Sequence, residues 1–464
     1  MFLHLFPFDK IPKDSTIIIY GAGNVGNEYL EQIEQTGWCN VESIVDKDYA
    51  RYKWMSLSVR EPEYLISGVT YDYVVIAIEA VLIADQIKAN LHELGIPMQK
   101  IVNISERYLN INNQKNVIDY SDKPYIESSI RIAFRMVGSM GTYIIYLRLL
   151  EEIVKICPGC EIDLFCKSNM AKPFYTKQPN VREIKEFNQI KNESEQYDII
   201  LKVWHVIHLE KLFYQKVYKI CPSLAKKLER LYNDFSNYYC NLSSEHCADN
   251  VFIKKAGFLG ITRYTALSHG GIFDLSNKKV NIPVDKEFET LYKKLKLKKY
   301  ITFNRGAAEI PGEMREQTKI WPKNYFEDFI AGFKRAFSDI EVIQVGSKNL
   351  EKVNGAGRYF LGEDIELVKY ILKNSIFHLD CEGGLVHLAT QLETKCIVLF
   401  GPTSAHYFGY EQNINIETDL CNDCRGIAAD WAVNCYRKTD KQICMHSITP
   451  EMVLEKAMQV MSAQ

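Results

Sequence analysis

The chain is 464 residues long, which is too long for one ordinary domain and fits two or three. Its 56 Lys and Arg residues nearly balance 58 Asp and Glu residues, and the net charge of −2 gives no electrostatic case for nucleic acid as a partner. No apolar run reaches the roughly 20 residues of a membrane-spanning helix, although peripheral membrane contact and oligomer formation stay open. The start lacks the basic and long apolar parts of a signal peptide. We therefore expect a cytoplasmic chain whose 13 cysteines stay reduced.

Residues 1–110 follow the order of a Rossmann-like domain, with a strand, a glycine turn, a helix and further strands. In the turn GAGNVG, Gly21 permits the tight bend, Gly23 lets a phosphate approach the backbone, and Gly26 lets the helix pack closely on the strand. Asp46 ends the next strand, where an acid that binds a ribose would lie. We predict a nucleotide or nucleotide-sugar site here.

Two alternatives stay open for this first domain. It could keep the glycine turn for packing and bind a different nucleotide, or nothing. It could also be an NAD-dependent oxidoreductase, but most of the chain would then be idle, so this reading is disfavoured.

Residues 111–128 are polar, contain Pro124 and lack an apolar period, which indicates a linker. Residues 129–283 then begin a second α/β block, with a strand, a turn at Gly138 and a helix. The stretch YDIILKVWHVIHL predicts a strand that enters a loop with His205 and His208.

Residues 284–464 alternate regularly between short apolar strands and helical patterns, which predicts a parallel sheet with right-handed crossovers. Two such blocks in tandem predict an α/β fold with two Rossmann-like halves that face a cleft. Ligands of such sheets lie beyond the carboxyl ends of the strands.

The most specific local signal is the stretch LDCEGGLVHLA in this last block. Gly383 and Gly384 open a helix whose free N–H groups would point at an anion, and His387 on its first turn could donate to the same phosphate. Glu382 could accept hydrogens from sugar hydroxyls, and Thr403 follows the next strand. The alternative is a tight acidic turn between a strand and a helix.

Two cations and two glycines mark the ends of earlier elements in the same block. Arg305 and Lys319 could neutralise a diphosphate, and Gly306 and Gly346 could let the backbone approach it. The alternative is that the two cations are solvated surface side chains.

Four cysteines cluster near the C-terminal end with the spacing C-x2-C-x10-C-x8-C. Four thiolates in one short loop suit a tetrahedral Zn²⁺ ion or a single iron, and they would leave no open coordination position for catalysis. We therefore predict a structural metal site in the loop 421–444; the alternative is four free thiols. The predicted ligands are Cys421, Cys424, Cys435 and Cys444.

Residues from about 129 to 462 resemble glycosyltransferase family 9, the heptosyltransferases. The resemblance rests on GSMG followed by ICPGCEIDLF, on KIWP, on CEGGLVHLATQLETKCIVLFGPT and on the cysteine-rich tail. It implies two Rossmann-like halves in the GT-B architecture: an acceptor half at 129–283 and a donor half at 284–464. It also implies inverting transfer of a sugar, often heptose from ADP-heptose, without a metal or other cofactor. A subset of the family carries a four-cysteine iron site, similar to the cluster here.

The chain departs from the family pattern at two places. Thr142 stands where the family has the aspartate that acts as general base, and Glu382 with Gly383 replaces an Asp-Ser pair. A threonine cannot accept a proton at neutral pH, so another group serves as base, the acceptor is itself a good nucleophile, or the enzyme is slow or inactive. His205 and His208 are the candidate bases; the alternative is that they are ordinary loop histidines.

Two hypotheses follow. The first is an inverting glycosyltransferase that uses a nucleoside diphosphate sugar and acts on a glycan, a lipid-linked saccharide or a protein. The second is a catalytically impaired sensor or scaffold that binds a nucleotide-sugar.

Overall fold

A computed structural model of the chain describes residues 4, 6–52, 58–78, 81–103, 117–122, 129–239, 246–268, 270–275, 279–306, 316–427, 431–437 and 442–463. The chain divides into two compact units, residues 1–116 and residues 117–464. Among the described residues, no helix combines the length and the apolar character needed to span a bilayer.

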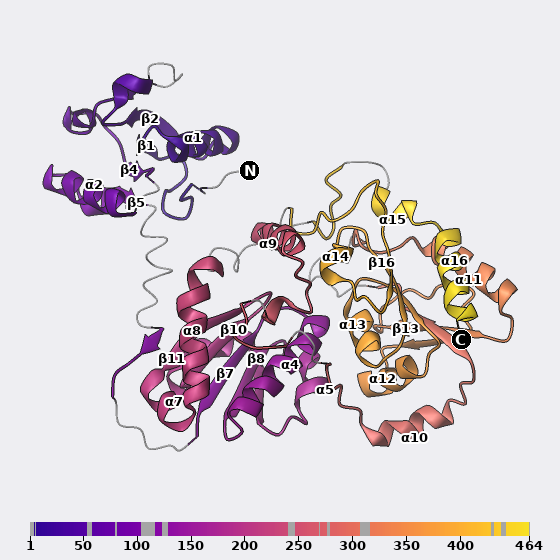
Figure 1. The fold of residues 1–464 in the computed structure, drawn as a ribbon. Helices are drawn as coiled ribbons and strands as arrows, with labels where there is room; N and C mark the ends of the chain where they lie inside the picture. The colour runs from indigo at the N-terminus through magenta and orange to yellow at the C-terminus, as the bar shows by residue number, and fades with distance from the viewer. Residues whose placement is uncertain are drawn as a thin grey trace. The chain divides into compact units, whose positions relative to one another are not determined.

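The first unit is a small Rossmann-like domain with helices around one parallel sheet (Figure 1). Its described strands lie in the order β3-β2-β1-β4-β5. A Cβ atom on Gly26 would lie 2.0 Å from the carbonyl oxygen of Gly21, so the helix can approach the strand this closely only with glycine. The elements are β1 (Thr16–Tyr20), α1 (Asn24–Thr36), β2 (Asn40–Val45), β3 (Val59–Arg60), β4 (Tyr73–Ile76), α2 (Val81–Glu93) and β5 (Ile101–Asn103).

The second unit begins with a sheet whose described strands lie in the order β6-β11-β10-β7-β8-β9. All neighbouring strands are parallel except β10 and β11, which form an antiparallel hairpin. The elements are β6 (Ile118–Asp119), β7 (Arg131–Met136), α4 (Met140–Ile156), β8 (Glu161–Cys166), α5 (Ser168–Tyr175), β9 (Val181–Glu186), α6 (Ile190–Glu193), β10 (Ile199–Val203), β11 (Ile207–Phe213), α7 (Tyr214–Ile220), α8 (Pro222–Tyr239) and α9 (His246–Phe258).

The second half of this unit contains a wholly parallel sheet in the order β14-β13-β12-β15-β16-β17. Its central strands β12, β15 and β16 are buried at every residue, as expected for a parallel sheet with helices on both faces. The elements are α10 (Lys286–Lys294), β12 (Tyr300–Phe303), α11 (Lys323–Ala336), β13 (Glu341–Gly346), β14 (Arg358–Leu361), α12 (Ile365–Lys373), β15 (His378–Cys381), α13 (Gly384–Gln391), β16 (Cys396–Leu399), α14 (Ala405–Phe408), β17 (Ile414–Ile416), α15 (Ile443–Ser447) and α16 (Pro450–Ser462).

The two halves of the second unit meet through α4 and α13, which pack against each other (Figure 1). Apolar side chains of both helices belong to one buried cluster that continues from one half into the other. A buried lysine makes a further connection: Nζ of Lys369 on α12 donates to the carbonyl of Pro173 on α5 over 3.0 Å and to that of Pro283 over 2.7 Å. The junction between the halves is therefore a packed interface with polar links.

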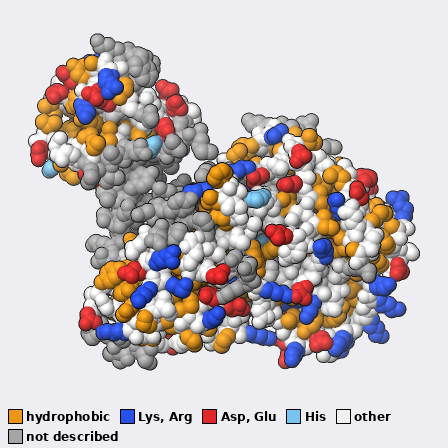
Figure 2. Space-filling view, viewed as in Figure 1, with side chains coloured by type: hydrophobic (Ala, Val, Ile, Leu, Met, Phe, Trp, Pro, Cys, Tyr) orange, Lys and Arg blue, Asp and Glu red, His pale blue; other side chains and the backbone are white. Residues whose placement is uncertain are grey.

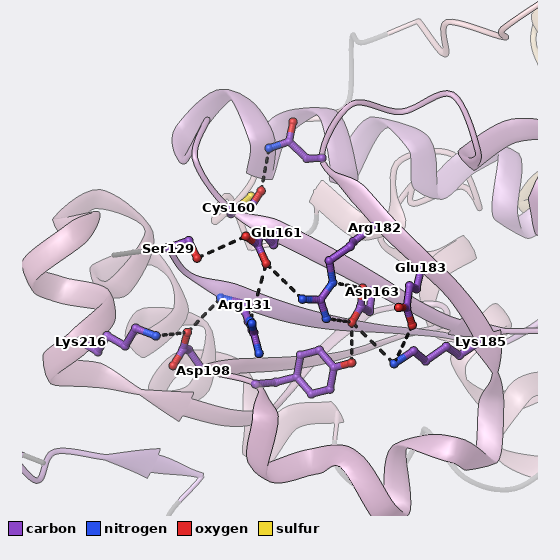
Figure 3. Close-up of polar contacts among 12 residues, drawn as sticks. Ser129, Arg131, Cys160, Glu161, Asp163, Arg182, Glu183, Lys185, Asp198 and Lys216 are labelled. Carbon is purple, nitrogen blue, oxygen red and sulfur yellow. Dashed lines mark hydrogen bonds and ion pairs between the residues drawn. The ribbon is translucent and has the colours of Figure 1, made fainter. Parts of the chain in front are cut away.

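The sheet of the first half also carries a buried ionic cluster on β8 and β9 (Figure 3). The carboxylate of Asp163, 1% exposed, accepts hydrogen bonds from Nε and Nη2 of Arg182 over 3.1 and 2.6 Å. The hydroxyl of Tyr197 donates to it over 2.7 Å. Burial opposes ionisation of this carboxyl, but the hydrogen bonds outweigh burial and the pKa of Asp163 is lowered.

The structure differs from the sequence-based expectation in three respects. The stretch predicted as one strand with a following loop is the β10–β11 hairpin. The chain reverses at a tight turn in which the N–H of Trp204 donates to the carbonyl of Val206 over 3.0 Å. The stretch predicted as a linker contains β6, which pairs with β11. The edge strands β9, β14 and β17 were not expected from the pattern.

Candidate functional site

Polar side chains of the second half gather where its sheet reverses its strand order, between β12 and β15. Ligands of open α/β sheets lie at such a switch point. Within the sheet, the amide of Asn304 donates to the two carboxylate oxygens of Asp380 over 3.0 and 3.1 Å, and Nε2 of His378 lies 3.4 Å from the same carboxylate. His378 and Asp380 are fully buried, and burial raises the pKa of Asp380. These side chains therefore support the turn from inside the fold.

Glu382 follows β15 and is the centre of the site. Nζ of Lys319 donates to the backbone carbonyl of Glu382 over 3.1 Å and lies 3.8 Å from its Oε2 atom. Nε2 of His387 lies 3.7 Å from Oε1 of Glu382, and Nδ1 lies 2.6 Å from the hydroxyl of Tyr410. Burial would raise the pKa of the Glu382 carboxyl, but the surrounding positive charges, Lys319 foremost, lower it to about 2. Glu382 is thus ionised at neutral pH.

Two buried oxygen atoms of this site accept or donate no hydrogen bond within the described part of the chain. They are Oε2 of Glu382, whose residue is 8% exposed, and Oγ1 of Thr403, whose residue is 1% exposed. Buried polar atoms are nearly always hydrogen-bonded in folded proteins, and exceptions often mark a place for a ligand or water. The site therefore has capacity for a polar ligand.

The start of α13 lies directly against the start of α4 of the other half. A Cβ atom on Gly141 would lie 2.2 Å from Cδ2 of His387, and one on Gly384 would lie 2.7 Å from Cε of Met140. A side chain at position 141 would therefore displace the imidazole of His387, whereas one at position 384 would displace only the flexible end of Met140. Thr142, next in the chain, packs its side chain over Gly138, where a Cβ atom would lie 2.9 Å away.

The sheet of the first half reverses its strand order between β7 and β10, and this second switch point adjoins the same junction. The hydroxyl of Tyr146 lies 3.0 Å from the carbonyl of Val137 and 2.8 Å from that of Trp204, so it joins the ends of the two strands. His205, in the hairpin turn, is 5% exposed, and its Nδ1 lies 2.7 Å from the hydroxyl of Tyr407 on α14. A histidine of the first half thus contacts the second half directly.

His208 lies in a different environment from His205. It is inside β11 opposite Lys202, and its Nε2 is buried without a hydrogen-bond partner among the described residues. Burial, with the charge of Lys202, lowers the pKa of His208 to about 4. The imidazole is therefore neutral at physiological pH and a weak base.

The remaining predicted donor residues lie against other partners. The guanidinium of Arg305 pairs with Glu316 and lies 3.6 Å from a carboxylate oxygen of Glu351. A Cβ atom on Gly306 or on Gly346 would collide with Leu350, at 2.7 and 2.3 Å. Gly346 also has a φ of 152° and would place a Cβ atom 2.8 Å from Oδ1 of Asn304, so its backbone conformation and packing favour glycine.

The four cysteines of the loop 421–444 form no disulfide; Cys444 is buried and the others are half-buried. Burial foremost, and then the thiols of Cys421, Cys424 and Cys435, raise the pKa of the Cys444 thiol to about 12. In the described part of the chain, however, no three His, Cys, Asp or Glu side chains are gathered closely enough to hold a metal ion. The thiols do not form a closed metal site in this arrangement.

In the first unit, the glycine turn and Asp46 lie together as their spacing predicts. Oδ2 of Asp46 accepts a hydrogen bond from the N–H of Ala22 in the turn over 2.8 Å, and Oδ1 accepts one from Asp48 over 2.8 Å. A Cβ atom on Gly23 would meet nothing within 4 Å, so there is open space beside this glycine.

Several residues at the junction of the two halves belong to no recognisable sequence motif. Tyr407 and Tyr410 hold the two histidines, and Nη2 of Arg263 donates to the carbonyl of Trp204 over 2.9 Å. Asn304 was detectable only as a polar residue directly after an apolar strand. The partners of the histidines lie 23 and 202 positions away in the chain, so no local pattern could pair them.

Comparison with known proteins gives a match to a family model within the first unit and similar solved structures over most of the chain. Residues 13–102 match the family model described as C2185-like, N-terminal. No curated protein matches the sequence of this chain. A similar solved structure is the glycosyl transferase family 9 protein of Veillonella parvula DSM 2008, 14% identical, with 74% of this chain and 100% of that chain covered and a TM-score of 0.46.

Two further structures are similar at the same level. The ADP-heptose LPS heptosyltransferase II of E. coli is 15% identical, with 71% of this chain and 98% of that one covered and a TM-score of 0.44. The iron-containing dodecameric glycosyltransferase TibC of enterotoxigenic E. coli H10407 is 11% identical, with 72% and 76% covered and a TM-score of 0.48. Family 9 glycosyltransferases are thus among the structures that this chain resembles, as its motifs predict.

The topology itself defines the fold class. Residues 117–464 contain two Rossmann-like halves whose strand-order switch points adjoin one junction, which is the GT-B architecture, and residues 1–116 add a separate Rossmann-like unit. The predicted α/β fold class is confirmed.

Proposed function

We propose that residues 117–464 form a glycosyltransferase that takes a sugar from a nucleoside diphosphate donor. The observation that carries this proposal is the environment of Glu382. A buried, ionised carboxylate has one oxygen without a hydrogen bond, and it lies beside Lys319 and His387 at the switch point of a parallel sheet. A hydroxyl of a sugar or ribose would complete the hydrogen bonding of Glu382. The diphosphate would lie between Lys319 and the N-terminus of α13, where free N–H groups favour an anion.

The first half would bind the acceptor, near the turn from Gly138 to Thr142. An acceptor hydroxyl would attack the anomeric carbon in line with the bond to phosphate, which breaks as the glycosidic bond forms and releases the nucleoside diphosphate. The hydroxyl proton would pass to the general base, the configuration would invert, and no metal or cofactor is required for this step. We propose heptose or a related sugar as the group transferred, to a glycan, a lipid-linked saccharide or a protein.

The general base in this proposal is His205 rather than His208. His205 lies in the turn at the switch point of the first half and is held by Tyr407 of the second half. The low pKa of His208, about 4, makes it a poor proton acceptor. Thr142 packs over Gly138 and has no basic group, so it does not serve as base.

Binding measured by calorimetry tests the donor site. Lys319→Ala and His387→Ala should each weaken the binding of a nucleoside diphosphate sugar by about tenfold or more, because each removes a charge-assisted contact. Lys323→Ala is the matched control, since Lys323 pairs with Glu351 outside the site and should leave the affinity unchanged. Unchanged affinity in both site variants would refute the donor site.

A second candidate function is a nucleotide-sugar sensor or scaffold without turnover. The threonine at position 142, in place of the family carboxylate, favours it. Transfer to acceptors, or slow hydrolysis of the donor, would distinguish the two, because only an enzyme shows turnover that His205→Ala abolishes.

A structural metal ion in the cysteine loop is a separate proposal. Zn²⁺ or iron bound by Cys421, Cys424, Cys435 and Cys444 would draw the four sulfur atoms closer than they lie here. Elemental analysis of purified protein should find about one metal ion per chain, and absence of both metals would refute it.

For the first unit, we propose a nucleotide or nucleotide-sugar beside Gly21, Gly23, Gly26 and Asp46, and Asp46→Ala in the full chain should weaken its binding.

A further inference from the structure

Two cysteines, Cys157 and Cys160, lie at the two ends of one tight turn between α4 and β8. The residues between them are Pro158 and Gly159, and the N–H of Cys160 donates to the carbonyl of Cys157 over 3.1 Å. A hydrogen bond of this kind closes a β-turn, whose two end Cα atoms lie less than about 7 Å apart. Disulfides join Cα atoms about 4.4–6.8 Å apart, so the turn brings the two cysteines within reach of each other.

The side chains of the two cysteines meet beneath this turn. The thiol of Cys157 donates a hydrogen bond to the sulfur of Cys160, and the two form no disulfide. Both residues are buried, at 4% and 2% exposure, whereas Pro158 and Gly159 are exposed. The two cysteines are therefore a pair of reduced thiols directly under a surface turn.

The hydrogen bond makes the two thiols chemically different. It lowers the pKa of Cys160, although burial opposes this effect, and it raises the pKa of Cys157 above its ordinary value. Cys160 is therefore the thiol that ionises more readily. The thiolate is the form that attacks an oxidant, and a nearby second thiol can then resolve the product.

A third thiol, Cys221, lies beside the same turn. It contacts the sulfur of Cys157, but its Sγ also donates to the carbonyl of Ile156 over 3.3 Å and lies 3.5 Å from the hydroxyl of Ser223. Within the part of the chain that the structure describes, no three His, Cys, Asp or Glu side chains are gathered closely enough for a metal ion. The geometry thus favours chemistry of the pair in the turn over metal binding by three thiols.

We propose that Cys157 and Cys160 are an oxidisable dithiol, which a two-electron oxidant such as hydrogen peroxide closes to a disulfide, whatever reaction residues 117–464 catalyse. The thiolate of Cys160 attacks one oxygen of the peroxide, the O–O bond breaks, and Cys160 becomes a sulfenic acid as the first water leaves. The sulfur of Cys157 then attacks the sulfur of Cys160, and its proton leaves with the hydroxyl as the second water. One peroxide is thereby reduced to two waters while two thiols are oxidised to one disulfide. A thiol reductant such as dithiothreitol reverses the change.

Peptide mapping of the full chain tests the pair. The folded protein is treated with hydrogen peroxide, unfolded in N-ethylmaleimide to block the remaining thiols, digested with trypsin and analysed by mass spectrometry. The tryptic peptide 156–167 holds Cys157, Cys160 and Cys166. Cys166, which is fully buried in β8, is the internal control. We expect this peptide to lack two hydrogens and to carry one maleimide, on Cys166, and dithiothreitol before blocking should restore all three thiols.

Two variants assign the roles of the two thiols. Cys157→Ala should leave Cys160 as a sulfenic acid that dimedone traps, and Cys160→Ala should slow the oxidation of Cys157 by about tenfold or more. Equal dimedone labelling of Cys157 in Cys160→Ala would overturn these roles. The wild-type map needs no variant: a peptide 156–167 that keeps three maleimides, or a bond between Cys157 and Cys221, overturns the proposal.

Discussion

The imidazole of His387 lies against the backbone of Gly141, across the junction of the two halves. Each residue belongs to the first turn of a helix, His387 to α13 and Gly141 to α4. The starts of the two helices therefore touch, and this contact helps to fix how the two halves meet. Tyr410 holds the far nitrogen of the imidazole, so the ring has little freedom to move aside.

A methyl group at Gly141 should therefore disturb the site. In Gly141→Ala the new Cβ would lie 2.2 Å from Cδ2 of His387, and the ring or the helix would have to shift. We expect a loss of stability of about 1–3 kcal/mol, typical of an overpacked core. We also expect weaker binding of the donor, because His387 leaves its position beside Glu382. Urea unfolding and calorimetry measure the two effects.

Gly159→Ala is the control for this variant. Gly159 is exposed, and a Cβ atom there would meet nothing within 4 Å, so stability should change by less than about 0.5 kcal/mol. If Gly141→Ala is as stable as this control and binds the donor normally, the close packing of the two helix starts is refuted.

The two histidines of the first half should differ sharply in their effect on turnover. His205→Ala should lower kcat by about 10²- to 10⁴-fold, the usual contribution of a general base. His208→Ala should have a much smaller effect, since the pKa of His208, about 4, already makes it a poor base. Steady-state kinetics with a fixed donor and acceptor will decide. Equal losses in both variants would contradict the assignment of His205.

The buried cluster around Asp163 should make stability depend on pH. Asp163→Asn keeps the volume but weakens hydrogen bonds from Arg182 and Tyr197, which should cost about 1.5–3 kcal/mol at pH 7. The folded-state pKa of Asp163 is lowered, so its contribution is fully present above the unfolded value of about 3.9 and is lost as pH falls through the folded value.

The stability gap between wild type and Asp163→Asn should accordingly be constant from about pH 5 to pH 8 and narrow below about pH 4. Urea midpoints at several pH values measure it. Glu289→Gln, which breaks an exposed pair with Lys293, should change stability by at most about 0.5 kcal/mol. A gap that stays the same in strong acid would contradict the ionised state of Asp163.

The fold could be predicted from the sequence where strands are buried on both faces. The runs that form β12, β15 and β16 are short, buried and mostly apolar, with Thr302, His378 and Asp380 as the polar exceptions, and a glycine follows each strand within three residues. The edge strands β14 and β17 have only three or four residues and are partly exposed, so they carry little periodic signal. The β10–β11 hairpin was missed because its turn contains neither Gly nor Pro.

The centre of the site could also be predicted, because Glu382, Gly383, Gly384 and His387 are close in sequence. The residues that surround this centre could not be predicted from the sequence. Tyr407 reaches His205 from the opposite half, and Thr318 bonds to Trp431 far along the chain. Contacts of this kind depend on how two halves pack, which local residue spacing does not encode.

The mixed distribution of acidic and basic side chains on the surface does not indicate a binding site for a polyanion such as nucleic acid. On the face shown in Figure 2, Lys and Arg side chains are interspersed with Asp and Glu, in keeping with the net charge of −2. The positive charges that matter to the proposal are those gathered around Glu382.

The most direct test is a calorimetric titration of the wild type and of Glu382→Gln with a panel of nucleoside diphosphate sugars, ADP-heptose included. Glu382→Gln keeps the shape of the side chain and removes the charge that would accept a sugar or ribose hydroxyl. We predict that at least one donor binds the wild type and binds the variant about tenfold more weakly, or worse. The account is contradicted if no nucleotide-sugar binds the wild type, or if the variant binds as tightly.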